Sequence, residues 1–234
     1  MDKKKKSIIY WINLIEYLVK NQITKIHVSK EYNSYKIIKK IFSHPKFIKT
    51  KSKMEVIIKC SSPNFDHNNF DQKKLINEIK NYKKDLKIKK FYAVQWLSRG
   101  NLNNNKKRLF FLNKDKKLIN SSIKIIKKKY SKFFLLFPYS ETFLEACIAL
   151  IRMDGFTIYL NLEEKNYLKY LKFEKFKNIT IRPFIKLSQN KINLRLKKIL
   201  RLNIKKRNIL GTMISISKKK QIDQIINVIN EKNF

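Results

Sequence analysis

The segment Ile23–Cys60 decides the expected fold, because it reads ITKIHV at residues 23–28, SYKIIKKIF at residues 34–42 and MEVIIKC at residues 54–60. The first and last of these stretches are short apolar runs typical of strands, and the middle one has apolar residues at helical spacing. A further amphipathic helix is predicted before them, over Ser7–Lys20. The resulting order, α-β-α-β, is typical of an α/β protein.

The alternation continues toward the C-terminus. A polar helix is predicted over Asp71–Leu86 with Asp71 as its cap, and Gly155 is expected to end a later helix. The other predicted helices are Leu118–Tyr130 and Glu141–Met153, and the other predicted strands are Phe91–Leu97, Phe133–Phe137, Phe156–Leu162 and Ile179–Ile185. When the sequence is shifted by 109 residues, the strand and helix predicted in Ile23–Phe47 align with those predicted in Lys132–Phe156. An internal duplication is therefore one interpretation, and a chance similarity of order is the other.

The segment Ser98–Arg108 is the best candidate for a linker, because it combines a glycine, clustered asparagines and a closing run of charge. We therefore expect three parts: an N-terminal extension or added α/β module over residues 1–108, an α/β domain over residues 109–186, and a C-terminal domain over residues 187–234.

The charge is strongly positive, with 55 lysines and arginines against 17 acidic residues and a formal net charge of +38. Codon bias toward A and T inflates lysine, but it does not explain why acidic residues are scarce. Basic residues occur from Lys3 to Lys232, a distribution that indicates a polyanionic partner in contact with the whole chain. Nucleic acid is the predicted partner, and an anionic membrane surface is the alternative.

Several other classes are disfavoured by the sequence. Cys60 and Cys147 lie in unlike contexts, and the three histidines add no metal spacing, so neither a cofactor nor a metal is expected. No apolar stretch is long enough to span a membrane. The apolar run that begins at Ile8 is interrupted by Asn13 and Glu16, which disfavours a signal peptide.

The C-terminal third holds the most specific motifs. Leu187–Asn190, Leu194–Asn203 and Leu210–Lys218 resemble segments of the small-subunit ribosomal protein eight family, and so do Phe137–Ser140 and Asp154–Phe156. In this resemblance, Ser215-Ile216-Ser217-Lys218 corresponds to the family's serine-rich loop. Gln189, Ile216 and Lys219 depart from the family pattern, and the closing glycine-glycine strand is missing.

The resemblance implies an α-β-α-β-β module followed by a small, incomplete β-rich C-terminal domain, with an N-terminal α/β extension. It also implies a structural constituent of the small ribosomal subunit that binds the central domain of its ribosomal RNA beside neighbouring ribosomal proteins. Biased composition and degenerate motifs favour a mitochondrial or other organellar ribosome. A non-ribosomal organellar RNA-binding or RNA-processing factor is the alternative.

The predicted RNA-binding residues carry small hydroxyls, positive charge or an aromatic ring. Alternation places Ser215 and Ser217 on one face, where their hydroxyls can bond phosphate, and Ile214 and Ile216 on the other face, toward the core. An ordinary strand end with solvated serines is the competing interpretation. The complete set is Gly211, Thr212, Ser215, Ser217, Lys218, Lys219, Lys220, Arg195, Lys197, Lys198, Arg201, Lys205, Lys206, Arg207, Tyr139 and Ser140.

No catalytic site is predicted. Asp66, His67 and Asp71 lie in a polar connection where aspartate has turn and cap duties, and Glu163-Glu164 is typical of a surface pair. The sequence shows no glycine loop of the kind that cradles phosphate. We therefore expect a protein that is not an enzyme and has no small-molecule substrate.

Overall fold

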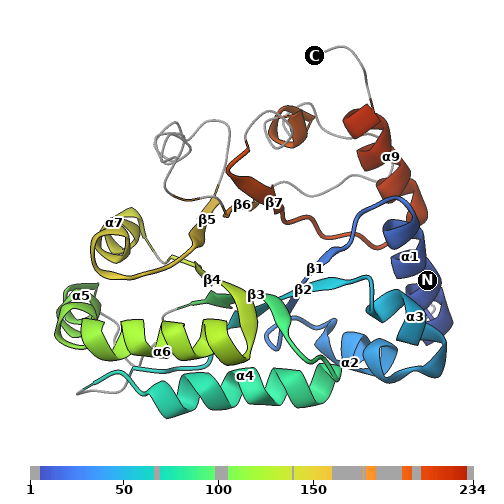
Figure 1. The fold of residues 1–234 in the computed structure, drawn as a ribbon. Helices are drawn as coiled ribbons and strands as arrows, with labels where there is room; N and C mark the ends of the chain where they lie inside the picture. The colour runs from blue at the N-terminus through green and yellow to red at the C-terminus, as the bar shows by residue number, and fades with distance from the viewer. Residues whose placement is uncertain are drawn as a thin grey trace, which may run out of the picture. The chain divides into compact units, whose positions relative to one another are not determined.

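The computed structural model describes residues 6–65, 69–97, 105–138, 140–159, 176, 178–182, 197–201 and 207–230. Strands and helices alternate along these residues (Figure 1). The strands follow one another in sequence order in a seven-stranded sheet, and the pairs β1–β2, β2–β3, β3–β4, β4–β5 and β6–β7 are parallel. They are β1 (Lys25–Ser29), β2 (Glu55–Cys60), β3 (Phe91–Trp96), β4 (Ser131–Leu136), β5 (Gly155–Tyr159), β6 (Ile179–Arg182) and β7 (Ile209–Thr212).

Parallel neighbours need crossover connections, and helices supply them. The labelled helices are α1 (Ile8–Lys20), α2 (Tyr35–Ser43), η1 (Pro45–Phe47), α3 (Ile48–Lys51), α4 (Gln72–Leu86), α5 (Asn105–Lys114), α6 (Lys116–Lys129), α7 (Glu141–Leu150) and α9 (Lys219–Asn230). Contacts divide the chain into two compact units. Unit 1 comprises residues 1–24, 44–54 and 158–234, and unit 2 comprises residues 25–43 and 55–157. The predicted division after residues 108 and 186 stays a prediction.

Unit 2 has an apolar sheet face that packs under helices. Alternate strand residues such as Ile58, Val94 and Phe134 are buried, and α4 and α6 contact β2, β4 and each other (Figure 1). From the helix side, Leu75, Ile79 and Ile126 are also buried. Strands that are covered in this way read as nearly continuous apolar runs, which is why the sequence identified them.

Side-chain caps begin several helices. The hydroxyl of Ser7 accepts from the backbone N–H of Tyr10, and the carboxylate of Asp71 accepts from that of Lys74. The hydroxyl of Ser140 accepts from the backbone N–H of Phe143. The predicted cap at Asp71 and the predicted helix start after Ser140 are therefore confirmed.

Unit 1 contains α1, β6, β7 and α9. Leu200, Ile225 and Val228 form a buried cluster, and Ile214 and Ile216 pack against it. Ser215 and Ser217 are exposed, so the predicted alternation of these four residues is confirmed. Strand β7 nevertheless ends at Thr212, before both serines.

The predicted fold class is wrong. Strand β3, which was assigned to an N-terminal extension, pairs in parallel with β4 of the predicted α-β-α-β-β module. In the C-terminal part, the described residues form the parallel pair β6–β7 followed by helix α9, in place of a β-rich domain. Local patterns located the strands but not their partners, because pairing joins residues far apart in the sequence.

Two local predictions also need correction. Helix α7 ends at Leu150, and Gly155 is the first residue of β5, so this glycine does not terminate the helix. Helix α5 begins at Asn105, inside the predicted linker Ser98–Arg108. The pair Glu163-Glu164 lies outside the described residues.

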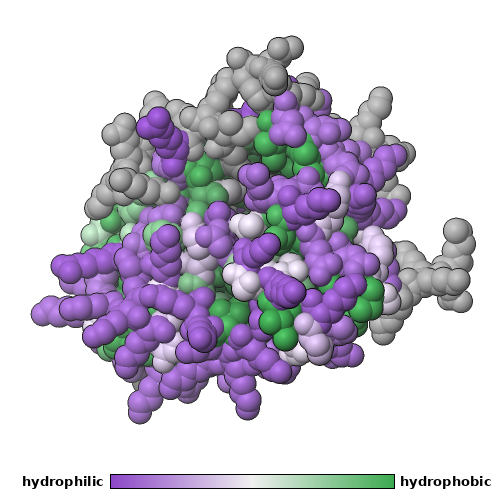
Figure 2. Space-filling view, turned by 45° about the vertical axis from the view of Figure 1, so that its right-hand side comes forward, coloured by the Kyte–Doolittle hydropathy of each residue, from purple (hydrophilic) through white to green (hydrophobic). Residues whose placement is uncertain are grey.

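The visible face in Figure 2 is mainly hydrophilic, with scattered apolar patches. Among the described residues, no helix combines the length and hydrophobicity needed to cross a bilayer.

Candidate active site at the carboxyl ends of the first strands

Each of the first three strands carries a polar residue on the same face: His27 in the middle of β1, and Lys59 and Gln95 next to the last residues of β2 and β3. Lys59 is in register with Ser29 on one side and with Gln95 on the other. Because side chains alternate between the faces of a strand, His27, Lys59 and Gln95 lie on one face of the sheet. Ligand sites of parallel α/β folds form at the carboxyl ends of the strands.

A hydrogen-bonded chain fixes the state of His27. The Nε2 of Gln95 donates to Oγ1 of Thr157 over 2.7 Å, which leaves Oε1 of the same amide as an acceptor. This Oε1 lies 2.6 Å from Nε2 of His27, so that ring nitrogen carries a proton and donates. In the neutral ring, Nδ1 of His27 is then an acceptor, and it lies 3.3 Å from the hydroxyl of Tyr32. The chain therefore orients both the imidazole and the phenol.

A buried ammonium lies on the same sheet face. The Nζ of Lys59 is 2.8 Å from Oε2 of Glu31, and the two side chains are 7% and 32% exposed. The same ammonium lies 4.9 Å from the ring centre of Phe137. A buried charge needs a partner of this kind, because desolvation alone strongly disfavours the charged form.

Tyr82 holds the segment that carries Glu31 and Tyr32. Its hydroxyl accepts from the backbone N–H of Lys30 over 2.7 Å and donates to the carbonyl of Lys59 over 2.9 Å. Burial raises the pKa of Tyr82 far above its ordinary value, so the phenol keeps the proton that it donates. This one side chain fastens the segment after β1 to the end of β2.

Glu78 organises the chain after β2 in a similar way. Its carboxylate accepts from the backbone N–H of Ser61 over 3.0 Å and from that of Ser62 over 3.1 Å. Burial raises the pKa of Glu78, and the two backbone donors offset part of this effect.

None of these residues was predicted as a site residue. His27 was considered only for metal spacing, Lys59 and Gln95 were placed in apolar strands, and Glu78 and Tyr82 were placed in the helix Asp71–Leu86. The available signal was a polar side chain within each apolar strand, since lysine and glutamine are seldom fully buried without a partner.

The structure brings together one group of the predicted RNA-binding residues. Gly211 and Thr212 end β7, Ser215, Ser217 and Lys218 follow, and Lys219 and Lys220 begin α9. Lys197, Lys198 and Arg201 lie in a short helix, Arg207 lies in a turn, and Ser140 caps α7. Arg195, Lys205, Lys206 and Tyr139 lie outside the described residues. The roles of these individual residues stay predictions.

The stretch between β7 and α9 is held by named contacts within unit 1. Oε1 of Gln221 accepts from the backbone N–H groups of Ser217 and Lys218 over 2.8 and 3.2 Å. Nζ of Lys6 and the hydroxyl of Tyr10 both donate to the carbonyl of Ser217.

Next to this stretch, apart from Gly211 and its two chain neighbours, no atom of the described residues lies within 4 Å of the position that a Cβ of Gly211 would take. Oγ1 of Thr212 is buried and has no hydrogen-bond partner among the described residues. Open space beside an unpaired hydroxyl is compatible with a bound polar group.

Comparisons with known proteins now identify the fold. No protein-family model matches the sequence, and neither does any curated protein. Solved aldo-keto reductases do match the structure. The holo form of one from Bacillus halodurans gives a TM-score of 0.68 at 7% identity, covering 98% of this chain and 84% of that chain. One from Bombyx mori in complex with NADP gives 0.65 at 10% identity, covering 98% and 81%. One described as putative, from Pseudomonas aeruginosa, gives 0.67 at 10% identity, covering 96% and 84%.

This likeness overturns the resemblance to ribosomal protein eight. The neighbours are oxidoreductases, so the predictions of a ribosomal constituent, of an rRNA partner and of a protein that is not an enzyme are wrong. The alternative of an organellar RNA-binding or RNA-processing factor fails for the same reason. The organellar location stays a prediction. The chain has the parallel, barrel-like β/α fold of the aldo-keto reductases.

Proposed function

We propose that this chain is an NADP(H)-dependent oxidoreductase that interconverts a carbonyl compound and the corresponding alcohol. The observation that carries the proposal is the hydroxyl of Tyr32, held 3.3 Å from Nδ1 of His27 at the carboxyl end of a parallel sheet. The aldo-keto reductase fold supports the reaction class, and the NADP bound to the Bombyx mori protein supports the cofactor.

Reduction of a carbonyl requires a hydride for its carbon and a proton for its oxygen. A bound nicotinamide dinucleotide supplies the hydride. Tyr32 is the proton donor of this chain, because its phenol is oriented by His27 and lies at the carboxyl end of β1. When His27 carries both protons, its Nδ1–H donates to the oxygen of Tyr32, which leaves the phenolic proton for the carbonyl. Gln95 accepts from Nε2 in either state and keeps the ring in place.

Lys59 supports this chemistry electrostatically. Its ammonium is 7% exposed, so water screens its charge weakly. Glu31 neutralises part of that charge. The ion pair also anchors the residue that precedes Tyr32 to the end of β2. The remaining positive potential favours negative charge as it develops on a substrate oxygen.

The residues present in unit 1 fit a phosphate group. The unpaired hydroxyl of Thr212, the open space at Gly211 and the exposed hydroxyl of Ser215 are all hydrogen-bonding or steric features that suit an anion. Lys218 and Lys220 add positive charge where α9 begins. Helix N-termini after the last strands of β/α barrels frequently bind phosphate.

The deciding experiment is Tyr32→Phe, with NADPH oxidation followed at 340 nm over a panel of aldehydes and ketones. Loss of the proton donor should lower kcat by about 10²- to 10⁴-fold. Tyr35→Phe is the matched control, because the hydroxyl of Tyr35 also donates a hydrogen bond, to Asp85, but lies outside the His27 chain. Retained turnover in Tyr32→Phe, or no turnover by the unaltered chain with any member of the panel, would refute the proposal.

The phosphate assignment has its own test. Lys218→Gln combined with Lys220→Gln should raise the KM for NADPH about tenfold and leave kcat nearly unchanged, because only binding energy is lost. An unchanged KM for NADPH would show that no phosphate of NADPH binds at this end of α9.

A further inference from the structure

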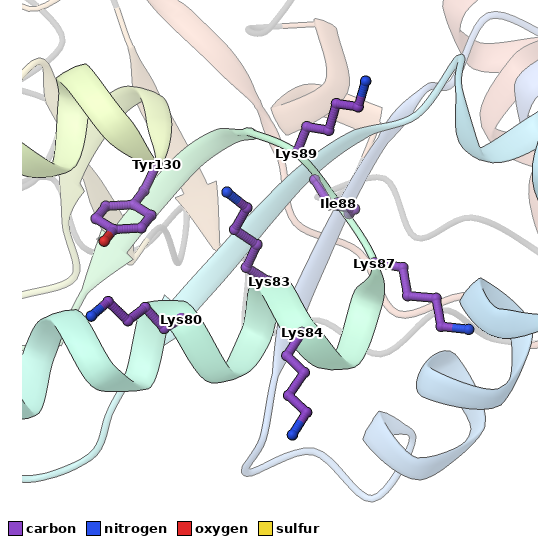
Figure 3. A pocket seen from close by; sticks show the side chains of 7 residues that line it. All are labelled: Lys80, Lys83, Lys84, Lys87, Ile88, Lys89 and Tyr130. Atoms are coloured by element: carbon purple, nitrogen blue, oxygen red, sulfur yellow. The ribbon is translucent and has the colours of Figure 1, made fainter.

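We propose that a second site, on the outer side of unit 2, binds a compact oligophosphate anion. The site, called here the lysine hollow, has a volume of about 600 Å³ and is lined by Lys80, Lys83, Lys84, Lys87 and Lys89, together with Ile88 and Tyr130 (Figure 3). It lies where α4 and α6 end and where β3 and β4 begin. Within unit 2 it is therefore at the opposite end of the strands from the candidate active site.

None of the residues that line the hollow is acidic. The two carboxylates of α4 are both engaged elsewhere. Glu78 binds the N–H groups of Ser61 and Ser62, and Asp85 binds Lys39 and the hydroxyl of Tyr35, each over 2.7 Å. Helix α6 contains no acidic residue. Clustered positive charge without carboxylates among the lining residues creates a positive electrostatic potential, which favours binding of an anion.

The backbone of Lys87 gives a second and independent observation. This residue caps α4 in the left-handed conformation, with φ 50° and ψ 48°. Glycine is usual at such a cap, because a residue with a Cβ is strained there. This conformation is found at two non-glycine residues of the described chain, Gln22 and Lys87, and the side chain of Lys87 lines the hollow.

The arrangement fits a ligand with several phosphate groups. In Figure 3, Lys80 and Lys83 extend toward Tyr130, whereas Lys84 and Lys87 extend away from it. Nζ of Lys83 lies 6.0 Å from the ring centre of Tyr130. Two ammonium groups and a phenol can donate to the oxygens of one phosphate, and the flexible side chains of Lys84 and Lys87, which point elsewhere in Figure 3, would have to turn to reach further phosphates of the same ligand.

Lysines also complement the partial negative charge of helix C-termini, and this simpler role explains Lys83 and Lys84 in the last turn of α4. It does not explain the strained cap at Lys87. It also does not explain Lys89, which lies beyond the helix in the connection to β3.

The test is isothermal titration of the full chain with inorganic tripolyphosphate, comparing Lys80→Gln/Lys83→Gln with Lys116→Gln/Lys117→Gln. The first variant alters the hollow, and the second removes the same charge from exposed positions in the first turn of α6. We expect about tenfold weaker binding in the hollow variant and little change in the control. Equal affinity of the two variants would overturn the proposal, and it would do so whether or not the chain is a reductase.

A second variant separates ligand binding from folding. Lys87→Gly relieves the left-handed strain, so it should raise Tm by about 2 °C while it weakens tripolyphosphate binding. If Tm rose while tripolyphosphate binding stayed unchanged, the side chain of Lys87 would take no part in binding, which would contradict the proposal. Vesicles of phosphatidylcholine with or without phosphatidylglycerol distinguish a lipid headgroup from a free anion. Binding to the anionic vesicles without binding of tripolyphosphate would also overturn it.

Discussion

An ion pair lies at each end of strands β1 and β2, and the two pairs have the same N···O distance but differ in their exposure to water. Lys25 and Glu55 meet over 2.8 Å at the amino ends of the strands, with side chains 39% and 37% exposed. Lys59 and Glu31 meet over 2.8 Å at the carboxyl ends, where the lysine is 7% exposed. The distance is equal, but water screens the first pair and is largely excluded from the second. Exposure therefore decides which pair contributes to stability and to chemistry.

The carboxyl ends also contain the chain from Tyr32 through His27 and Gln95 to Thr157, whereas the amino ends of β3 and β4 face the lysine hollow. At the carboxyl ends, the side chains from Tyr32 to Thr157 satisfy one another. The amino ends leave positive charge without a carboxylate among the lining residues.

Replacing Gln95 with leucine should have the largest effect on stability. The substitution keeps a similar side-chain volume but removes the amide, so Oγ1 of Thr157 and Nε2 of His27 each lose their hydrogen bond to it. We expect the free energy of unfolding in urea to fall by about 2–3 kcal/mol. Thr157→Val, which removes one of the two bonds, should cost less. A fall of less than about 0.5 kcal/mol for Gln95→Leu would show that the chain does not stabilise the fold.

Lys59→Met should have the next largest effect. It leaves the carboxylate of Glu31 without its partner, but Glu31 is 32% exposed and can be rehydrated, so the cost should be about 1–2 kcal/mol. Turnover of a carbonyl substrate should fall as well. Urea titration and steady-state kinetics measure the two effects. The double variant Lys59→Met/Glu31→Gln should recover stability without recovering turnover, and recovery of both would contradict an electrostatic role.

Glu78→Gln should change how stability depends on pH. Burial raises the folded pKa of Glu78 above the ordinary value of 4.5, so the folded state keeps this proton after the unfolded state has released it. The free energy of unfolding should therefore fall as pH rises from 4.5 through the raised pKa, with a slope of at most about 1.4 kcal/mol per pH unit. The variant should lose this contribution. Urea titration at several pH values measures this dependence. If the free energy of unfolding varied with pH in the same way in the unaltered chain and in Glu78→Gln, the prediction would be wrong.

Lys25→Met should have the smallest effect. An exposed pair of this kind is worth less than about 0.5 kcal/mol and is screened by salt. The measured change should therefore vanish in high salt. If Lys25→Met lowered the free energy of unfolding as much as Lys59→Met does, exposure would not explain the difference between the two ion pairs.

Sequence patterns located most of the local structure. The strands predicted at Ile23–Val28, Met54–Cys60 and Phe91–Leu97 are found at Lys25–Ser29, Glu55–Cys60 and Phe91–Trp96, because buried parallel strands are short apolar runs. The possible duplication at a shift of 109 residues stays a prediction, because regular alternation of strand and helix gives two segments of such a fold the same order of elements with or without a duplication.

The fold and the candidate site required information that local patterns lack. Strand order depends on contacts between distant segments, and His27, Lys59 and Gln95 become a site only when three strands lie side by side. The glycine, hydroxyl and lysine residues around Ser215 predicted contacts with phosphate, and that role stays a prediction. Net charge was a poor guide to fold, because it describes the surface of the molecule.

The phenol of Tyr82 has a kinetic consequence. Because it bonds the backbone on both sides of the site, the segment that bears Tyr32 and the end of β2 must shift together or lose both hydrogen bonds, one of which is buried. If Tyr32 is the proton donor that we propose, its position is set before a substrate arrives.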